Sequence, residues 1–481
     1  MLFRPIPVGF NPALPSFMST YLRRRLRTAV LILLPLSAFA QGAKPDPQIL
    51  AQFGSFENAG LQRFIDSKGQ QMNRVSDRPG DYGFTIVDSP VINAFATPDG
   101  HVYFTRGIMA YFNNEAQFAG VLGHELGHIT ARHGQKQQTR STIASVLLGV
   151  GSMLNKNVAA LAQPLSQGLG ILFLKYSRDN ENEADGLGVK YSTKIGYDAA
   201  QMADFFITLQ RTEAQSGAGG IPTFLSSHPS SADRYQRVKG LAAQQKSTLG
   251  KTKLNVNREG YLRAIEGLPY GNDPRQGFVE GGVFYHPGLK FQLPIPAGWK
   301  SQNTPDQFRM SEPNGKAVLV FTAAPGATLE AAAQGLTQQL GLQSPTAQQT
   351  TINGFPALRI EGDQAAQQDQ QQAPAHTLTY LIQDGQSIFA LIGLAAPATF
   401  SSYAPQFSTS AQGYSRLTEA ARLNRLPERV RIKTAAKPTT LAAAFSANGI
   451  PAKRHEELAI LNGMKTTDRL SAGQLYKVLG K

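Results

Sequence analysis

The spacing of apolar and polar residues divides the chain into three regions. From residue 41 to about 268 the apolar positions recur with helical spacing, whereas between 276 and 425 they alternate in short runs typical of strands. A polar join that contains Gly, Pro and Asp, residues 269–275, separates the two. The last stretch, 428–481, has a strand-like run at each end and two helical patterns between them. The pattern predicts an α+β protein of three domains, the first mainly helical with a small sheet.

The middle region, 276–425, predicts an antiparallel sheet with a helix. Two apolar runs, 377–383 and 387–392, flank Asp384-Gly385, a dipeptide typical of a tight hairpin turn. The low-complexity tract 364–372 predicts a solvated loop. Three further runs have strand character and one has helical character: strands at 289–293, 317–322 and 357–361, and a helix at 329–342.

The C-terminal region resembles a LysM module in its second half only. Leu461-Asn-Gly463 and Leu470-Ser-Ala-Gly-Gln474 carry the resemblance, but Lys437-Pro-Thr-Thr-Leu441 stands where such modules usually have Gly-Asp-Thr-Leu. The resemblance implies a βααβ fold and a peptidoglycan ligand. The changed first half puts glycan binding in doubt.

Residues 1–40 carry the pattern of an export signal. Arginines at positions 23, 24, 25 and 27 precede the apolar run 29–39, and Ala38-Phe39-Ala40 has the A-x-A form of a cleavage site. We expect cleavage after Ala40 and a periplasmic or secreted protein, with Met18 as an alternative start. The alternative is an uncleaved membrane anchor, which the short run disfavours.

The composition excludes several kinds of chemistry. The 481 residues include no cysteine, which excludes disulfides, cysteine-held zinc, iron–sulfur clusters and thiol nucleophiles. Any metal must therefore be held by His, Asp or Glu. The formal net charge of +14 falls to about +9 without the five arginines of residues 1–40. Because the basic residues are scattered and aromatic residues do not interleave with them, nucleic acid is not an expected partner.

The segment His124-Glu125-Leu-Gly-His128 is the decisive chemical motif. It lies in a predicted helix that Asn114 can cap, with Gln117 three residues later. Because they are four residues apart on one helix face, His124 and His128 can bind one tetrahedral cation. Glu125 then reaches the open coordination position as a general base, where zinc would lower the pKa of water to about 7 and polarise a scissile carbonyl. The alternative is a chance match in a surface helix.

A second helical pattern, residues 177–191, supplies the predicted third ligand. Glu181 shares a stripe with the residues at 184, 188 and 191, so its carboxylate faces the apolar side, where it needs a partner or a metal. Asp185, one turn later, can accept a hydrogen bond from a ligand histidine and fix its tautomer. The alternative for Asp185 is an ordinary acceptor or a salt bridge.

Two nearby residues are expected in solvent. Glu183 lies about 200° around the helix from Glu181. His133 does not complete a metzincin motif, which needs Gly at position 131 and His at 134, where this chain has Ala131 and Gly134. We expect His133 to be either a solvated residue or a residue at the C-terminal end of the helix.

Three motifs in order resemble the CAAX prenyl protease/HtpX/BepA family of zinc metallopeptidases, and the soluble periplasmic branch fits best. They are residues 88–105 (DSPVINAFATPDGHVYFT), the HExxH helix, and Ser177-Arg178 followed by the two carboxylates. The resemblance covers about residues 65–265. It implies a zincin-type fold and one zinc per chain, with these roles: His124, His128 and Glu181 as ligands, Glu125 as the base, and Asp185 as a supporting, proton-donating residue.

The same resemblance implies residues that surround a substrate. An edge strand within 93–105 would bind an extended peptide by strand addition, with Asn93 as a contact. His228, in a His-Pro loop, is either a fourth or gating ligand or a loop residue that precedes a helix. Arg234 either binds a substrate carbonyl or closes a salt bridge.

The leading hypothesis is a secreted zinc-dependent endopeptidase that cleaves unfolded or misassembled envelope proteins. A second hypothesis is a peptidoglycan-binding protein with a vestigial protease domain, and a third is a membrane-associated protease, embedded in the membrane. The apolar runs 142–155 and 158–174 are broken by polar residues. We therefore expect them to form buried or amphipathic helices that cover the site.

Overall fold

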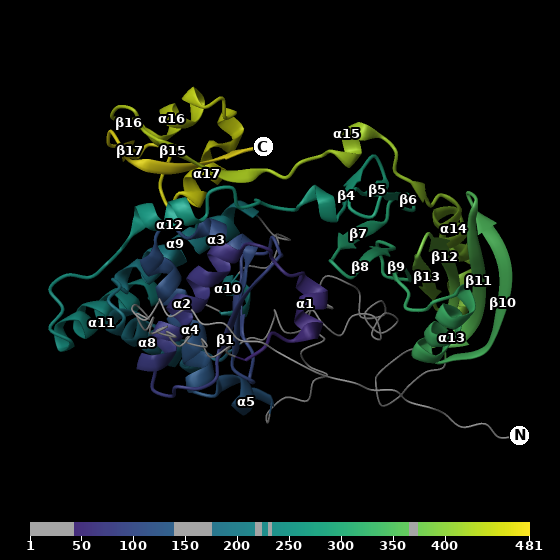
Figure 1. The fold of residues 1–481 in the computed structure, drawn as a ribbon, viewed down its shortest axis with the longest axis horizontal. Helices are drawn as coiled ribbons and strands as arrows, with labels where there is room; N and C mark the ends of the chain where they lie inside the picture. The colour runs from purple at the N-terminus through teal and green to yellow at the C-terminus, as the bar shows by residue number, and fades with distance from the viewer. Residues whose placement is uncertain (1–42, 139–175, 217–223, 229–232, 365–373) are drawn as a thin grey trace, which may run out of the picture. The chain divides into compact units, whose positions relative to one another are not determined.

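A computed structural model describes residues 43–138, 176–216, 224–228, 233–364 and 374–481 (Figure 1). Three predictions lie outside these residues: the signal peptide, the two apolar runs 142–155 and 158–174, and all but the first residue of the tract 364–372. The described part mixes helices and sheets, which confirms the α+β class in its coarse form. No described helix combines the length and hydropathy needed to cross a membrane.

The first region is mainly helical, with one small sheet of three strands. The sheet has the order β1-β3-β2, in which β1 runs parallel to β3 and β2 runs antiparallel to it, so β2 is an edge strand. The elements of this region are α1 (Pro47–Phe53), α2 (Ala59–Val75), β1 (Gly83–Val87), β2 (Ala94–Ala96), β3 (His101–Thr105), α3 (Arg106–Tyr111), α4 (Glu115–Thr130), α5 (His133–Gln138), α8 (Arg178–Lys194), α9 (Ala200–Ser216), α10 (Phe224–Ser227), α11 (Arg234–Thr248) and α12 (Arg258–Ala264).

Helix α4 begins with the predicted cap. The Asn114 side chain accepts a hydrogen bond from the backbone N–H of Gln117 at 2.8 Å. The Gln117 side chain reaches back one residue further than in a standard capping box and accepts from the N–H of Asn113 at 2.7 Å. Every residue from 116 to 128 is buried. The helix that carries the HExxH motif is therefore a central element of the core.

Glycines let α4 and α8 approach until their backbones touch. A Cβ atom on Gly123 would lie 2.9 Å from the carbonyl oxygen of Gly188, and a Cβ on Gly188 would lie 2.9 Å from the backbone nitrogen of His124. Any larger residue would push the helices apart. This contact brings the carboxylates of α8, Glu181 and Asp185, within reach of the histidines of α4.

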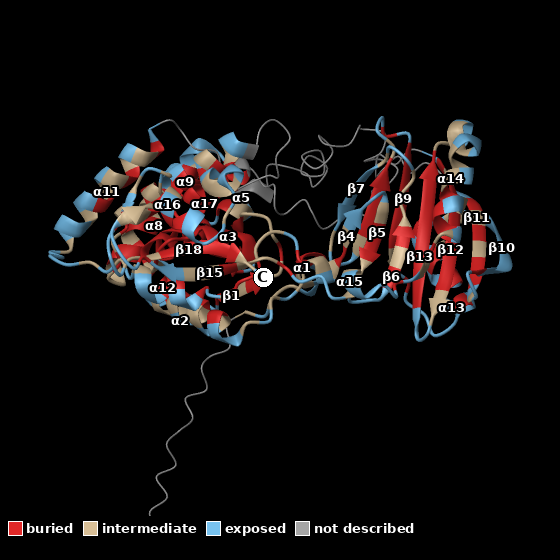
Figure 2. Cartoon of the chain, turned by 90° about the horizontal axis from the view of Figure 1, so that it is seen from above, coloured by how far each residue is buried: buried red, intermediate tan, exposed pale blue. Residues whose placement is uncertain are grey.

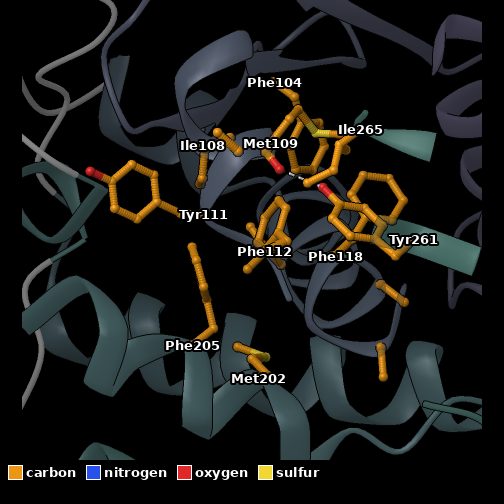
Figure 3. Packing of buried hydrophobic residues seen from close by; sticks show 14 of the residues in the cluster. Phe104, Ile108, Met109, Tyr111, Phe112, Phe118, Met202, Phe205, Tyr261 and Ile265 are labelled. Atoms are coloured by element: carbon orange, nitrogen blue, oxygen red, sulfur yellow. Dashed lines mark hydrogen bonds between the residues drawn. The ribbon is translucent and has the colours of Figure 1, made fainter. Parts of the chain in front are cut away.

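A large aromatic core packs around the start of α4 (Figure 3). Phe112, Phe118, Phe205 and Tyr261 converge there from the α3–α4 connection, α4, α9 and α12. The Tyr261 hydroxyl donates a hydrogen bond to the carbonyl oxygen of Met109 at 2.7 Å. This core fixes the helix start from which the motif projects.

The second region contains a seven-stranded antiparallel sheet and a separate four-stranded sheet. The larger sheet has the order β10-β11-β12-β13-β9-β8-β7 and the smaller one β14-β6-β5-β4. The elements are β4 (Phe278–Glu280), β5 (Val283–His286), β6 (Phe291–Pro294), β7 (Lys300–Asn303), β8 (Gln307–Ser311), β9 (Ala317–Ala323), α13 (Leu329–Leu340), β10 (Leu342–Ile352), β11 (Phe355–Gln364), β12 (Ala375–Asp384), β13 (Ser387–Ala395), α14 (Phe400–Gln412), β14 (Ser415–Arg416) and α15 (Ala420–Leu423).

The predicted hairpin and the predicted helix are both present in this region. Strands β12 and β13 pair with Asp384 opposite Ser387, and Gly385 has the positive φ of 65° that the turn requires. Alternate residues of these strands pack on opposite faces, one under α13 and the other under α14. Strand β10 was not predicted, because all but its two end residues are exposed and no alternation marks it (Figure 2).

The third region has the strand–helix–helix–strand order that its pattern predicts. Strands β15 (Arg429–Thr434) and β18 (Leu475–Gly480) pair antiparallel around α16 (Leu441–Ala447) and α17 (His455–Leu461). A second small pair joins β16 (Thr439–Thr440) and β17 (Arg469–Leu470).

The third region shares one hydrophobic core with the first. The fully buried Lys477 of β18 donates to the carbonyl oxygens of Ala110 and Phe112 at 2.8 and 3.0 Å. Burial lowers the pKa of Lys477 well below its ordinary value. These contacts anchor β18 to the connection that precedes α4.

Candidate metal centre

Four buried side chains place one donor atom each within 4.8 Å of one another: His124 and His128 of α4, Glu181 of α8, and His228 directly after α10. The Nε2 atoms of the two α4 histidines are 3.1 Å apart, and each lies 3.5 Å from a carboxylate oxygen of Glu181. The Nδ1 atom of His228 is 3.2 Å from His124 Nε2 and 3.0 Å from Glu181 Oε1. Donors of a tetrahedral zinc site with bonds of about 2.1 Å stand about 3.4 Å apart. The cluster therefore has the dimensions of a single-ion site.

The chemistry of the cluster also fits a cation. Glu181 Oε2 and both carboxylate oxygens of Glu125 are buried without a hydrogen-bond partner among the described residues, and the Arg234 guanidinium is 3.4 Å from Glu181 Oε2. Buried acceptors left in this way are costly unless a positive charge or a donor satisfies them. Imidazole nitrogens with a carboxylate oxygen form a donor set that suits zinc.

Glu125 lies at the edge of the cluster. It follows His124 on α4, is fully buried, and has Oε1 3.6 Å from His228 Nε2. Burial raises the pKa of Glu125 above its ordinary value, although His228 and His124 oppose this shift. The carboxyl group thus stands beside the four donors without being one of them.

Asp185 and two arginines form a buried ion-pair network behind His124. Asp185 Oδ1 lies 3.0 Å from His124 Nδ1. Asp185 accepts from Arg234 Nε at 3.0 Å, from Arg234 Nη2 at 2.7 Å and from Arg237 Nη2 at 2.6 Å. The Arg234 guanidinium also lies 3.9 Å from the ring centre of Phe206. Of the two interpretations of Arg234, the structure shows the salt bridge, and at 1% exposure the side chain does not face solvent.

The prediction of a solvated His133 is wrong. His133 is fully buried, with Nδ1 2.9 Å from His128 Nδ1 and Nε2 3.1 Å from Glu183 Oε2. The physical reason is the backbone of Arg132, whose φ of 58° is left-handed and ends the helical phase of α4. The chain turns there, so α5 begins at His133 and directs its ring back to the cluster. Glu183 itself is exposed, as predicted.

Sequence reasoning missed Tyr176, which stacks on a member of the cluster. Its ring centre is 3.9 Å from that of His128, with 23° between the planes. Burial, together with Glu125 and Glu181, raises the pKa of the Tyr176 hydroxyl far above its ordinary value. Its place directly before the Ser177 cap of α8 was the one available signal, and nothing in it indicates a stacked ring.

The edge strand β2 runs close to the cluster. A small hollow beside it is lined by Ala96, Thr97, Pro98, His128, Ile129, Arg132, Gly134, Gln135 and Tyr176. Asn93 precedes this strand but is only 3% exposed, and its side-chain oxygen accepts from the N–H of Ala94 at 2.9 Å. Its role as a substrate contact stays a prediction.

The sequence is similar to several known proteases. Residues 57–242 match the family model described as peptidase family M48. The putative beta-barrel assembly-enhancing protease of Vibrio cholerae is 29% identical over 194 residues, which cover 38% of this chain and 40% of that protein. The beta-barrel assembly-enhancing protease of Escherichia coli K12 is 28% identical over 200 residues, which cover 39% and 40%. Metalloprotease YcaL of the same strain is 29% identical over 182 residues, which cover 36% and 66%.

The match to the family model lies within the first region, and the chain spans about two fifths of the length of the first two relatives. Among solved structures, a Pseudomonas aeruginosa protein of unknown function, PA94, aligns with 25% of this chain and 88% of that chain at 17% identity. Its TM-score of 0.18 is too low to carry an argument. Residues 57–242 are thus similar to peptidase family M48, whose metallopeptidases are zinc-dependent.

Proposed function

We propose that the chain is a zinc-dependent endopeptidase in which His124, His128 and Glu181 hold the metal and Glu125 is the catalytic base. The observation that carries the proposal is the buried cluster of donors with the Glu125 carboxylate beside it, whose oxygens have no hydrogen-bond partner among the described residues. A structural zinc site has no use for such a carboxylate, whereas hydrolysis needs one.

The residues of the chain divide the work of hydrolysis among them. Zinc, when bound, supplies Lewis acidity that polarises a peptide carbonyl and makes water acidic near neutral pH. Glu125 accepts the proton of the attacking water and returns it to the leaving amine, because its oxygens have no competing hydrogen bond among the described residues. Asp185 orients His124 from behind by accepting from its Nδ1. The outer edge of β2, which pairs with no other described strand, is the place where an extended peptide would add.

His228 supplies the fourth donor and so keeps the cluster closed. Catalytic zinc sites hold three protein ligands and leave one position for water or substrate. We expect His228 to move aside when a peptide binds, so His228→Ala should raise kcat/KM for a peptide while the protein still binds one zinc. A fall in kcat/KM at unchanged zinc content would contradict the gating role.

Glu125→Gln tests the proposed reaction directly. The amide has nearly the same size but cannot take up a proton, so we expect casein or peptide hydrolysis to fall by at least ~100-fold with one zinc still bound. Zinc content by atomic absorption and a fluorogenic peptide assay would be measured on the same preparations. Glu125-independent hydrolysis would refute the mechanism, and loss of zinc in Glu181→Ala would support the ligand set.

The substrate class and location are a further part of the proposal. We propose that the protein is exported and cleaves unfolded or misassembled cell-envelope proteins. The sequence pattern of residues 1–40 supports export, and relatives named beta-barrel assembly-enhancing protease support an envelope substrate. Fractionation with N-terminal sequencing tests the location: a mature protein beginning at Gln41 in a periplasmic extract supports it, and an uncleaved chain in the membrane pellet opposes it.

A further inference from the structure

His128 contacts a second histidine on the side away from the cluster, and that histidine contacts a surface carboxylate. His128 Nδ1 lies 2.9 Å from His133 Nδ1, and His133 Nε2 lies 3.1 Å from Glu183 Oε2. His133 is fully buried, whereas the side chain of Glu183 is 55% exposed. The three residues come from α4, α5 and α8, so the contact joins three helices.

Because the Nε2 atom of His128 faces the cluster, the donor and the acceptor of each hydrogen bond in this series can be assigned. A neutral imidazole that offers Nε2 to a cation carries its proton on Nδ1. His128 Nδ1–H therefore donates to His133 Nδ1, which accepts. The proton of a neutral His133 must then reside on Nε2, from which it donates to the Glu183 carboxylate. Each of the three side chains can thus make its hydrogen bond in one consistent direction.

The ring of His128 is also held on its face. Tyr176 stacks on it at 3.9 Å between ring centres. With His133 at Nδ1 and Tyr176 on the face, neither rotation about the ring axis nor tilting of the ring is free. The Nε2 atom is thereby directed at the cluster.

We propose that His133 and Glu183 are positioning residues that set the tautomer and orientation of His128 for metal binding. The inference rests on the proposed zinc site but not on hydrolysis. It differs from the Asp185 contact, in which a carboxylate meets the ligand histidine directly.

The experiment measures zinc affinity by competition with a chromogenic chelator, on the full chain. The variants are His133→Leu, which removes the contacts with His128 and Glu183, His133→Asn, whose side-chain oxygen can stand near the Nδ1 position and accept, and Glu183→Gln. His101→Leu removes a similarly buried histidine of β3, whose Nε2 lies 2.8 Å from Thr85 Oγ1, and serves as the control for loss of a buried ring. Asp179→Asn removes an exposed charge from the same helix as Glu183. Circular dichroism checks the fold, and the visible spectrum of the cobalt-substituted protein reports the ligand geometry.

We expect His133→Leu to weaken zinc binding by roughly 10- to 100-fold and to shift the cobalt spectrum, with a clearly smaller loss in His133→Asn. Glu183→Gln should weaken binding severalfold, and both controls should match the wild type. Equal affinity in wild type and folded His133→Leu would overturn the inference, as would equal losses in His133→Asn and His133→Leu. If His133→Leu fails to fold, Glu183→Gln against Asp179→Asn decides.

These outcomes separate the inference from the proposed function. A wild type that binds zinc but cleaves no peptide, with the expected loss in the variants, would refute the peptidase and support the positioning role. A wild type that cleaves peptides, with unchanged zinc affinity in the variants, would support the peptidase and refute the positioning role.

Discussion

The two ligand histidines of α4 lie four residues apart yet are supported in opposite ways. His124 meets Asp185, a carboxylate with no exposure, at 3.0 Å. His128 meets His133 at 2.9 Å, and the carboxylate comes only after it, at the exposed Glu183. The carboxylate that supports His124 thus lies in the core, whereas the carboxylate behind His128 lies at the solvent-exposed surface.

The difference matters because a charge costs more in the core than at the surface. Asp185 is balanced by Arg234 and Arg237, and removing one member of a buried ion pair leaves the rest uncompensated. Glu183 can be solvated by water whether or not His133 is present. The contacts behind His124 should therefore contribute much of the local stability, while the contacts behind His128 should change the metal affinity with little effect on the stability of the fold.

The largest effect is expected for Asp185→Asn. The substitution keeps the shape but removes the nearer counter-charge of the buried Arg234 and leaves it only Glu181 Oε2 at 3.4 Å, so the free energy of unfolding should fall by about 3–5 kcal/mol. Urea unfolding followed by circular dichroism measures this, with Asp179→Asn, an exposed position on the same helix, as the control. Equal midpoints for the two variants would show that the buried network does not stabilise the fold.

Removal of the metal is expected to have the next largest effect. At a free zinc concentration of 100 times the dissociation constant, binding adds about 2.7 kcal/mol to stability. Chelation should lower the unfolding midpoint accordingly, and Glu181→Ala should show a much smaller difference between the zinc-loaded and chelated states. The difference should also shrink in Asp185→Asn and in His133→Leu, since both sides of the cluster orient a ligand. A full zinc effect in Glu181→Ala would contradict the ligand assignment.

Gly188→Ala should affect both sides at once, because α8 carries Glu181, Glu183 and Asp185. The new Cβ would lie 2.9 Å from the backbone nitrogen of His124, so the helices must separate at a cost of about 1–3 kcal/mol.

Gly186→Ala is the matched control for Gly188→Ala. Nothing lies within 4 Å of its Cβ, and the alanine should stabilise the helix by up to about 1 kcal/mol. Thermal unfolding and zinc affinity would be measured on both variants. A Gly188→Ala variant as stable as Gly186→Ala would show that close packing of α4 on α8 is not required.

The same comparison shows what the sequence could reveal about the site. Helical periodicity alone places His124 and His128 on one face and turns Glu181 inward, because these residues lie within uninterrupted helices. It also predicts that Asp185, one turn later, lies near a ligand histidine. Positions that depend only on the helical repeat could therefore be predicted from the sequence.

Contacts that depend on a break in a helix or on tertiary packing could not be predicted from the sequence. Arg132 adopts a left-handed conformation although it is not a glycine, so the sequence does not predict the turn that buries His133. The stacking of Tyr176 and the burial of Lys477 depend on contacts between segments far apart in the sequence. Strand β10 is exposed along most of its length and lacks the alternation that marks a half-buried strand. In each case tertiary packing decided what local pattern did not.

The smallest effect is expected for Glu183→Gln, and its size is what sharpens the comparison. The glutamate is half exposed, so its contact with His133 should contribute less than about 1 kcal/mol to the free energy of unfolding. That contribution should shrink in 1 M salt, where the screening length is about 3 Å, whereas the loss in Asp185→Asn should persist because Asp185 and Arg234 are both buried. Unfolding of the two variants at low and high salt measures the contrast. If the loss of stability in Glu183→Gln is large and independent of salt, then the contacts behind His128 stabilise the fold as much as those behind His124. The exposure of Glu183 then does not distinguish the two histidines.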